Sequence, residues 1–301
     1  MDKKLAPIIV FTYKRLDTLH KTISSLQLNA LASESLVYIF SDAAKSINDE
    51  APVNEVRKYL HTIAGFKEVN IIERESNMGL ANSIITGVSK IINEYGKAIV
   101  VEDDLLLAPN FLMFMNRALD FYERNLKVYS ISGYIFNIKP NNDIPYDVFF
   151  IKRHCSWGWA MWKDRWNEID WDVEDFNEFK NSKLKQRAFN GIGSDLSSSL
   201  TRQMNGEINS WAIRCVYNQF KKQTYTVYPL KSKVINLGFG AGATHTVKRL
   251  NQYKAALDNE LKYKFNFSED IFEDKIFIKR FKNKYSMSTR LWFYLLNKFI
   301  K

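Results

Sequence analysis

The sequence predicts an α/β protein with a doubly wound, mostly parallel sheet flanked by helices. Short apolar runs recur about every thirty residues over the first 135 residues, which is the length of a strand–helix unit. Apolar residues at helical spacing separate these runs. The run at residues 98–101 has no polar break, as expected of a strand that is buried on both faces of a parallel sheet.

Strands are expected at residues 7–11, 36–40, 69–73, 98–101 and 128–132. Helical spacing predicts helices across residues 16–26, 53–63 and 80–92, and Pro109 opens another at a favoured first-turn position. Farther along the chain, helices are expected across residues 180–204 and 206–220, and an extended segment at 224–234. A helical protein with short apolar runs is the alternative.

The chain is expected to form one α/β domain in two halves, residues 1–135 and 136–247, followed by an extension. Residues 248–301 are expected to form this extension, which is helical, basic and rich in aromatic residues. Residues 275–301 contain eight Lys or Arg, no Asp or Glu, and seven aromatic residues. Such a tail is either a surface for an anionic membrane or a solvated basic helix.

The composition is that of a globular protein, with 46% hydrophobic and 25% charged residues. The net charge of +10 favours anionic partners. Two cysteines, Cys155 and Cys215, make neither a disulfide framework nor a metal motif, so a reducing cytoplasm is expected. We expect no signal peptide, because the N-terminal apolar run is only about seven residues long and no small-residue cleavage site follows it. We expect no membrane span, because every apolar run is far shorter than the ~18 residues that a span needs.

The most informative segment is Glu102-Asp103-Asp104, which follows the buried run at residues 98–101. Crowded carboxylates repel one another unless a cation lies between them, and ligands of open α/β sheets bind at this end of the strands. A divalent metal held for a phosphate-bearing substrate is therefore expected, the alternative being an exposed acidic turn. Alternation along a strand would point Glu102 and Asp104 one way and Asp103 the other, with Asp104 as the metal ligand.

Three other strand ends carry candidate nucleotide-binding residues. They are Thr12, Tyr13 and Arg15 at the first, Asp42 at the second, and Asn77 with Gly79 at the third. Hydroxyls and a guanidinium can hold a base, ribose or diphosphate, and an aspartate can bind a ribose hydroxyl or cap a helix. Asn with Gly before a helix lets the backbone approach a ligand, although it also forms ordinary turns.

These segments, in this order, resemble the GT-A glycosyltransferases, closest to the N-acetylglucosaminyltransferase I type and to bacterial enzymes that build surface polysaccharides. The resemblance covers residues 5–247 and is carried by Thr-Tyr-x-Arg, Ser-Asp, Asn-x-Gly-Leu, and Glu-Asp-Asp-Leu followed by Ala-Pro-Asn-Phe. It implies a GT-A fold in which Asp104 ligates Mn²⁺ (or Mg²⁺) on a nucleotide diphosphate, with Glu102 and Asp103 beside the nucleotide sugar. Residues 1–135 would bind the donor, residues 136–247 would bind the acceptor, and residues 248–301 would extend the acceptor side.

A tryptophan-rich segment follows in the second half. Trp157 and Trp159 flank Gly158, and similar Trp-Gly-Trp segments in GT-A enzymes lie near the donor sugar. All three residues are therefore candidates for a sugar pocket, although Trp159, Trp162 and Trp166 also have the helical spacing of core residues.

An inverting transferase needs a carboxylate that deprotonates the acceptor hydroxyl. Enzymes of this type carry it near the start of a helix like the one expected at residues 206–220, so Glu207 is the first candidate, the alternative being a glutamate favoured by the helix dipole. The reserve candidates are Asp195, Asp170 and Asp172. Position 209 is Asn where many such relatives carry Asp. His245, in a glycine-rich loop, is a candidate second metal ligand or a partner of the leaving diphosphate.

The expected function is inverting, metal-dependent transfer of a hexosyl or N-acetylhexosaminyl group from a nucleotide diphosphate sugar, most naturally a UDP-sugar. The acceptor would be a glycan or a lipid-linked acceptor in bacterial surface polysaccharide synthesis, used in the cytoplasm or peripherally at the inner face of the cell membrane. A sugar-nucleotide pyrophosphorylase is one alternative, although residues 12–18 lack the glycines of its phosphate loop. A nucleic-acid-binding protein is another, but no nucleic-acid motif appears and no such partner is expected. A carbohydrate-binding protein without catalytic activity is a third alternative, because position 209 is Asn and not Asp.

Overall fold

The computed structural model describes residues 4–138, 144–238 and 252–299. Within them, one sheet of eight strands runs in the order β3-β2-β1-β4-β8-β6-β9-β7. Its strands are β1 (Ile8–Thr12), β2 (Leu36–Ser41), β3 (Glu68–Glu73), β4 (Lys97–Glu102), β6 (Val128–Ser132), β7 (Val148–Ile151), β8 (Trp159–Trp162) and β9 (Tyr225–Pro229). A separate antiparallel pair joins β5 (Leu105–Leu107) to β10 (Val234–Asn236).

The sheet is mostly parallel. Parallel pairing joins β1 to β2 and β4, β2 to β3, and β6 to β9. β8 is antiparallel to β4 and β6, and β7 is antiparallel to β9. The predicted α/β class, with a mostly parallel sheet flanked by helices, is confirmed.

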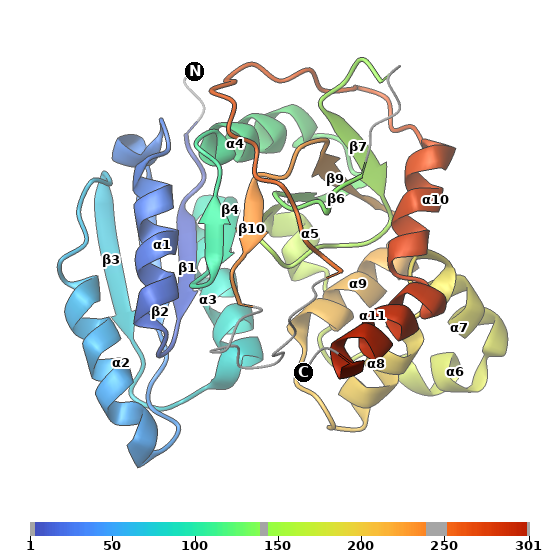
Figure 1. The fold of residues 1–301 in the computed structure, drawn as a ribbon, viewed down its shortest axis with the longest axis horizontal. Helices are drawn as coiled ribbons and strands as arrows, with labels where there is room; N and C mark the ends of the chain where they lie inside the picture. Colours follow the sequence, from blue (N-terminus) through green and yellow to red (C-terminus); the bar gives the residue numbers. More distant parts are fainter. Residues whose placement is uncertain (1–3, 139–143, 239–251, 300–301) are drawn as a thin grey trace.

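Helices cover both faces of the sheet (Figure 1). Those of the first half are α1 (Leu16–Gln27), α2 (Ile47–Leu60), α3 (Gly79–Tyr95) and α4 (Phe111–Tyr122). The later ones are α5 (Lys163–Asn167), α6 (Phe176–Asn181), α7 (Lys183–Phe189), α8 (Leu196–Met204), α9 (Trp211–Lys222), α10 (Lys275–Lys284) and α11 (Met287–Phe299), with short 3₁₀ turns at Ala32–Glu34 and Asn190–Ile192. Figure 1 shows α10 and α11, in red, beside α7 and α8, far from β3 and α2.

Two cores lie on opposite faces of the sheet because side chains alternate along each strand. Ile8 and Val10 of β1 pack in one core with residues of α1, α2 and α4. Ile9 and Phe11 pack in the other with residues of α3 and α9. The apolar strands are therefore buried on both faces, as the unbroken run at residues 98–101 predicts.

The second half departs from the sequence expectation at three places. Residues 159–162 form β8, where the tryptophan spacing favours a helix. The helix expected across residues 180–204 is divided into α7 and α8 by a 3₁₀ turn. The helix expected from residue 206 begins at Trp211, where the Ser210 hydroxyl accepts from the Ile213 backbone N–H. No helix of the described ranges is both long and apolar enough to cross a bilayer.

Candidate active site

The carboxyl end of β4 brings three carboxylates to one guanidinium. β4 ends at Glu102, and the chain then turns, with the Asp103 N–H donating to the Phe11 carbonyl at 3.0 Å. Arg15 Nη2 donates to Asp103 Oδ1 at 2.5 Å, and Arg15 Nη1 lies 3.0 Å from Asp104 Oδ2. The expectation that Asp103 and Asp104 point in opposite directions is wrong, because both lie in the turn and not in the strand.

The two aspartates have different surroundings. Asp103 Oδ2 also accepts from the Thr12 hydroxyl at 3.0 Å and from the Tyr13 N–H at 3.2 Å. Asp103 therefore fastens the turn to the end of β1. The Asp104 side chain is 12% exposed, against 4% for Asp103, and its Oδ2 meets Arg15.

The site carries more negative charge than Arg15 balances. Burial, together with the charges of Asp104 and Asp103, raises the pKa of Glu102 to about 8. Burial also raises the pKa of Asp103, despite the opposing effect of Arg15. Such an excess of buried negative charge is costly in the absence of a further cation.

At the ends of β2 and β3, the predicted ligand residues hold one another in place. Asp42 Oδ1 accepts from the Met78 N–H at 2.9 Å and Asp42 Oδ2 from the Gly79 N–H at 3.0 Å. The carboxylate thus caps the start of α3 from a neighbouring strand. Asn77 Nδ2 donates to the Ala43 carbonyl at 2.7 Å. These contacts fix the wall of the cavity that the four strand ends surround.

That cavity has a volume of about 530 Å³, and we refer to it as the first cavity. The predicted residues that line it are Thr12, Tyr13, Arg15, Asp42, Asn77, Gly79, Glu102, Asp103, Asp104 and Trp157. The structure therefore brings together most of the residues selected from the sequence, because the carboxyl ends of parallel strands meet at one edge of a sheet.

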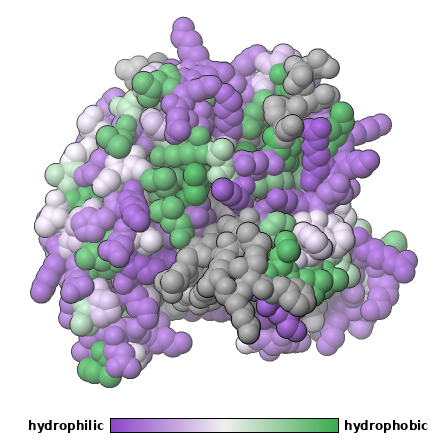
Figure 2. Space-filling model, in the orientation of Figure 1, coloured by the Kyte–Doolittle hydropathy of each residue, from purple (hydrophilic) through white to green (hydrophobic). Residues whose placement is uncertain are grey.

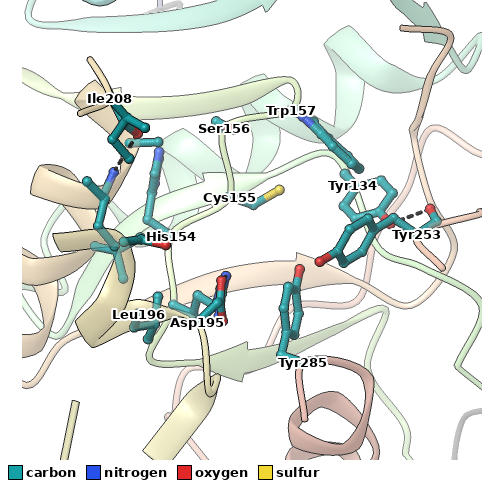
Figure 3. Close-up of a pocket in the computed structure, with 16 residues that line it drawn as sticks. Tyr134, His154, Cys155, Ser156, Trp157, Asp195, Leu196, Ile208, Tyr253 and Tyr285 are labelled. Carbon is teal, nitrogen blue, oxygen red and sulfur yellow. Dashed lines mark hydrogen bonds and ion pairs between the residues drawn. The ribbon is translucent and has the colours of Figure 1, made fainter. Parts of the chain in front are cut away.

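A second cavity, of about 300 Å³, adjoins the first because Trp157 and Tyr253 line both. Figure 3 shows aromatic rings on one side of it, with Tyr134, Trp157 and Tyr253 close together and Tyr285 beside Asp195. The Trp157 and Tyr134 rings are 4.6 Å apart at their centroids, and the Tyr134 hydroxyl donates to the Tyr253 carbonyl. Aromatic rings with polar edges suit the faces and hydroxyls of a sugar.

Asp195, a reserve candidate for the base, lies in this second cavity. Its oxygens accept from Arg153 Nη1 at 3.0 Å and from Nη2 at 2.8 Å, in a two-pronged ion pair. Burial raises the pKa of Asp195, but the charge and hydrogen bonds of Arg153 outweigh burial and lower it below the ordinary value. Asp195 is therefore ionised at neutral pH.

This ion pair predicts a dependence of stability on pH. Because the folded pKa of Asp195 is below its unfolded value, its contribution is present above about pH 4 and is lost as the pH falls through the folded pKa. Asp195→Asn should remove that part of the acid loss. Urea unfolding between pH 7 and pH 3 should give a shallower decline in the free energy of unfolding for the variant, and identical slopes would contradict the prediction.

Three predicted site residues lie elsewhere. Trp159 is 1% exposed and stacks in the core on Trp166, with ring centroids 5.6 Å apart, because β8 directs it into the face covered by α3 and α9. Gly158 is buried, with a φ of +57°, and a Cβ there would lie 2.7 Å from Val234 Cγ2. Gly158 therefore serves close backbone packing, and it lines neither cavity.

Glu207 is the third of these residues. Its side chain is 51% exposed and pairs with Arg202 Nε at 3.3 Å, and it lines neither cavity. It lies before α9 and not in its first turn, so the helix dipole does not act on it as expected.

Of the remaining candidates, Asp170 and Asp172 belong to one turn outside the two cavities. Asp170, another reserve, accepts from three backbone N–H groups of the following turn, and Asp172 is exposed in that turn. His245 lies outside the described residues.

The sequence interpretation missed cavity residues that come from distant segments. Tyr253 and Tyr285 belong to the C-terminal extension and give no local signal. Gly238 also lines the first cavity, and it does carry a local signal, because it belongs to the glycine-rich segment that contains His245. A Cβ at Gly238 would lie 2.3 Å from Asp104 Oδ2, so this glycine lets the chain pass over the carboxylate.

The residues at the end of β4 fit a divalent cation. The observation that supports this fit is geometric, since Glu102, Asp103 and Asp104 line one cavity in which Arg15 is the cation that pairs with the two aspartates. Magnesium and similar ions are commonly held by one or two carboxylates together with substrate phosphates, and Asp104 offers such a carboxylate to the first cavity. Among the described residues, no group of three His, Cys, Asp or Glu forms a metal cage.

No known protein-family model matches this sequence, and no curated protein matches it. Among solved structures, a mannosyltransferase from Pyrobaculum calidifontis, in complex with GDP-Man and Mn²⁺, aligns with 44% of this chain at 15% identity and a TM-score of 0.34. Residues 1–349 of TarS from S. aureus align with 78% of it at 10% identity and a TM-score of 0.41. A longer TarS structure aligns with 76% of this chain at 12% identity and a TM-score of 0.42. The alignments span 35%, 60% and 36% of those solved chains.

Proposed function

We propose that this protein is a metal-dependent glycosyltransferase that uses a nucleoside diphosphate sugar. One observation carries the proposal. The first cavity, which three carboxylates and Arg15 line, adjoins a second cavity lined by aromatic rings. The first has the groups for a nucleotide, a diphosphate and a cation, and the second has the groups for a sugar acceptor.

In this proposal the residues of the two cavities have distinct binding roles. The end of β1 and the start of α3 hold the nucleotide, with Arg15 available to the diphosphate. Asp104 would hold the cation, Mn²⁺ or Mg²⁺, which supplies charge neutralisation for the leaving diphosphate. Trp157, on the border between the cavities, would lie at the transferred sugar.

Asp195 replaces Glu207 as our candidate for the general base. Asp195 is the carboxylate among the described residues of the second cavity, and its Arg153 partner keeps it ionised. It would accept the proton of the acceptor hydroxyl as that oxygen bonds to the anomeric carbon and the bond to the diphosphate breaks. This in-line displacement inverts the anomeric centre.

The proposal also extends to the chemical class of the donor and of the acceptor. A UDP-sugar with a hexosyl or N-acetylhexosaminyl group is the proposed donor, and a glycan or lipid-linked acceptor of surface polysaccharide synthesis is the proposed acceptor. The order of strand-end motifs supports them, through the resemblance to GT-A enzymes.

The proposal is tested by binding and by product analysis. Calorimetry with UDP-, GDP- and dTDP-sugars, with and without Mn²⁺, should find one donor whose binding strengthens with the metal. Turnover of that donor should release a nucleoside diphosphate. Release of a nucleoside triphosphate from sugar nucleotide and pyrophosphate would identify a pyrophosphorylase instead, and failure of every sugar nucleotide to bind would reject the proposal.

A further inference from the structure

The outward face of α11 is unusually apolar. Five large side chains on this helix are between 37% and 70% exposed, namely Met287, Leu291, Trp292, Tyr294 and Leu295. We call this set the α11 face. In Figure 2, hydrophobic and pale residues gather where α11 lies in Figure 1, with hydrophilic residues around them.

The spacing of these residues makes one continuous stripe. Met287, Leu291 and Leu295 are four residues apart, so they lie one above another on the helix surface. Arg290, on another side of α11, turns towards the protein, and its Nη1 donates to the Ser194 hydroxyl at 3.3 Å. A helix of a globular protein normally directs its apolar stripe inwards, so the outward stripe indicates that something else covers it.

The charge around the α11 face limits what that partner can be. Exposed cations lie on α10 at Lys275, Lys279 and Lys282 and on α11 at Lys298, and residues 275–301 contain no acidic residue. A second copy of this chain would bring the same positive charge and repel the first. A surface that is both apolar and anionic complements both features.

We propose that α11 docks in the interface of an anionic lipid bilayer. Leu291, Trp292 and Leu295 enter the boundary between headgroups and acyl chains, as the apolar face of an interfacial helix does. The lysines of α10 and α11 contact lipid phosphates. Tyr285, a wall of the second cavity, precedes α11 by two residues, so docking brings that cavity close to the bilayer. The docking does not depend on the proposed transferase activity.

Flotation of the full chain with lipid vesicles tests this proposal. The protein should float with vesicles of phosphatidylcholine containing about a third phosphatidylglycerol, should float far less with phosphatidylcholine alone, and should be released by high salt. Leu291→Gln with Leu295→Gln should weaken binding about 10-fold or more, because the change removes apolar insertion and leaves the charge intact.

A matched control separates this face from exposed leucines in general. Leu28, after α1, and Leu126, before β6, are 78% and 71% exposed, and Leu28→Gln with Leu126→Gln should leave vesicle binding unchanged. Thermal unfolding should be the same for both double variants. Wild-type protein that does not float, or an α11 variant that floats equally well, would overturn the proposal. So would a wild-type dimer in sedimentation velocity that the α11 variant converts to a monomer without any vesicle binding.

Discussion

Asp258→Ala is expected to lower the free energy of unfolding by about 3–5 kcal/mol. Asp258 and Lys233 form an ion pair whose side chains are 2% and 5% exposed. Burial lowers the pKa of Lys233, since the charged ammonium is costly inside the protein. Removing Asp258 would leave that charge without its partner, which is far more costly than the loss of a surface pair.

The pair also fastens the C-terminal segment to the sheet. Asp258 Oδ2 accepts from Asn110 Nδ2 at 3.1 Å, and the Asp258 N–H donates to the Ser232 carbonyl at 2.8 Å. The Lys233 carbonyl in turn accepts from the Ala108 N–H at 2.8 Å. Asp258→Ala should therefore also weaken the contacts of the C-terminal segment with Asn110 and Ser232.

Thermal and urea unfolding measure the effect. The melting temperature should fall by roughly 5–8 °C, because the unfolding entropy of a chain of 301 residues is about 0.6 kcal/mol/K. Glu260→Ala is the matched control, because it breaks the neighbouring pair of Glu260 and Lys231, whose side chains are 55% and 58% exposed, and should cost less than about 1 kcal/mol. Combining Asp258→Ala with Lys233→Met should recover much of the loss. Equal losses for Asp258→Ala and Glu260→Ala would contradict the prediction.

The sheet and the first cavity were predictable from the sequence because they depend on local periodicity. Unbroken apolar runs set the strands, helical spacing sets the helices between them, and parallel strands bring their carboxyl ends together. Asp42 shows the limit of this reasoning. Its place at the cavity followed from the strand end, but its capping of α3 required knowing which helix start lies beside it.

The second half was harder to predict because its residues serve elements that are short or distant. β8 has four residues and continues directly into α5, so the tryptophans at 159, 162 and 166 fit helical spacing while two of them lie on a strand. Glu207 was misplaced because the start of α9 depends on the Ser210 cap and not on the apolar pattern. Tyr253 and Tyr285 reach the second cavity through tertiary packing, which no local pattern encodes.

Asp104→Asn is expected to reduce the release of nucleoside diphosphate by about 100-fold or more, since a bound cation supplies several kcal/mol of charge stabilisation at a leaving phosphate. The substitution keeps the size of the side chain against Gly238, whose α-carbon passes close to the carboxylate. It also removes a negative charge from beside Glu102 and Asp103, while Arg15 keeps its ion pair with Asp103. The fold should therefore be retained.

Activity and stability should thus respond differently to this change. The variant should unfold at or above the wild-type temperature, and calorimetry should find that Mn²⁺ no longer strengthens nucleotide-sugar binding. Glu207→Gln, with its half-exposed side chain outside both cavities, should turn over at the wild-type rate. Wild-type turnover by Asp104→Asn at saturating Mn²⁺ would show that the cation is held elsewhere. A large loss in Glu207→Gln would instead show that this glutamate reaches the acceptor, and would return the base to the position that the sequence favours.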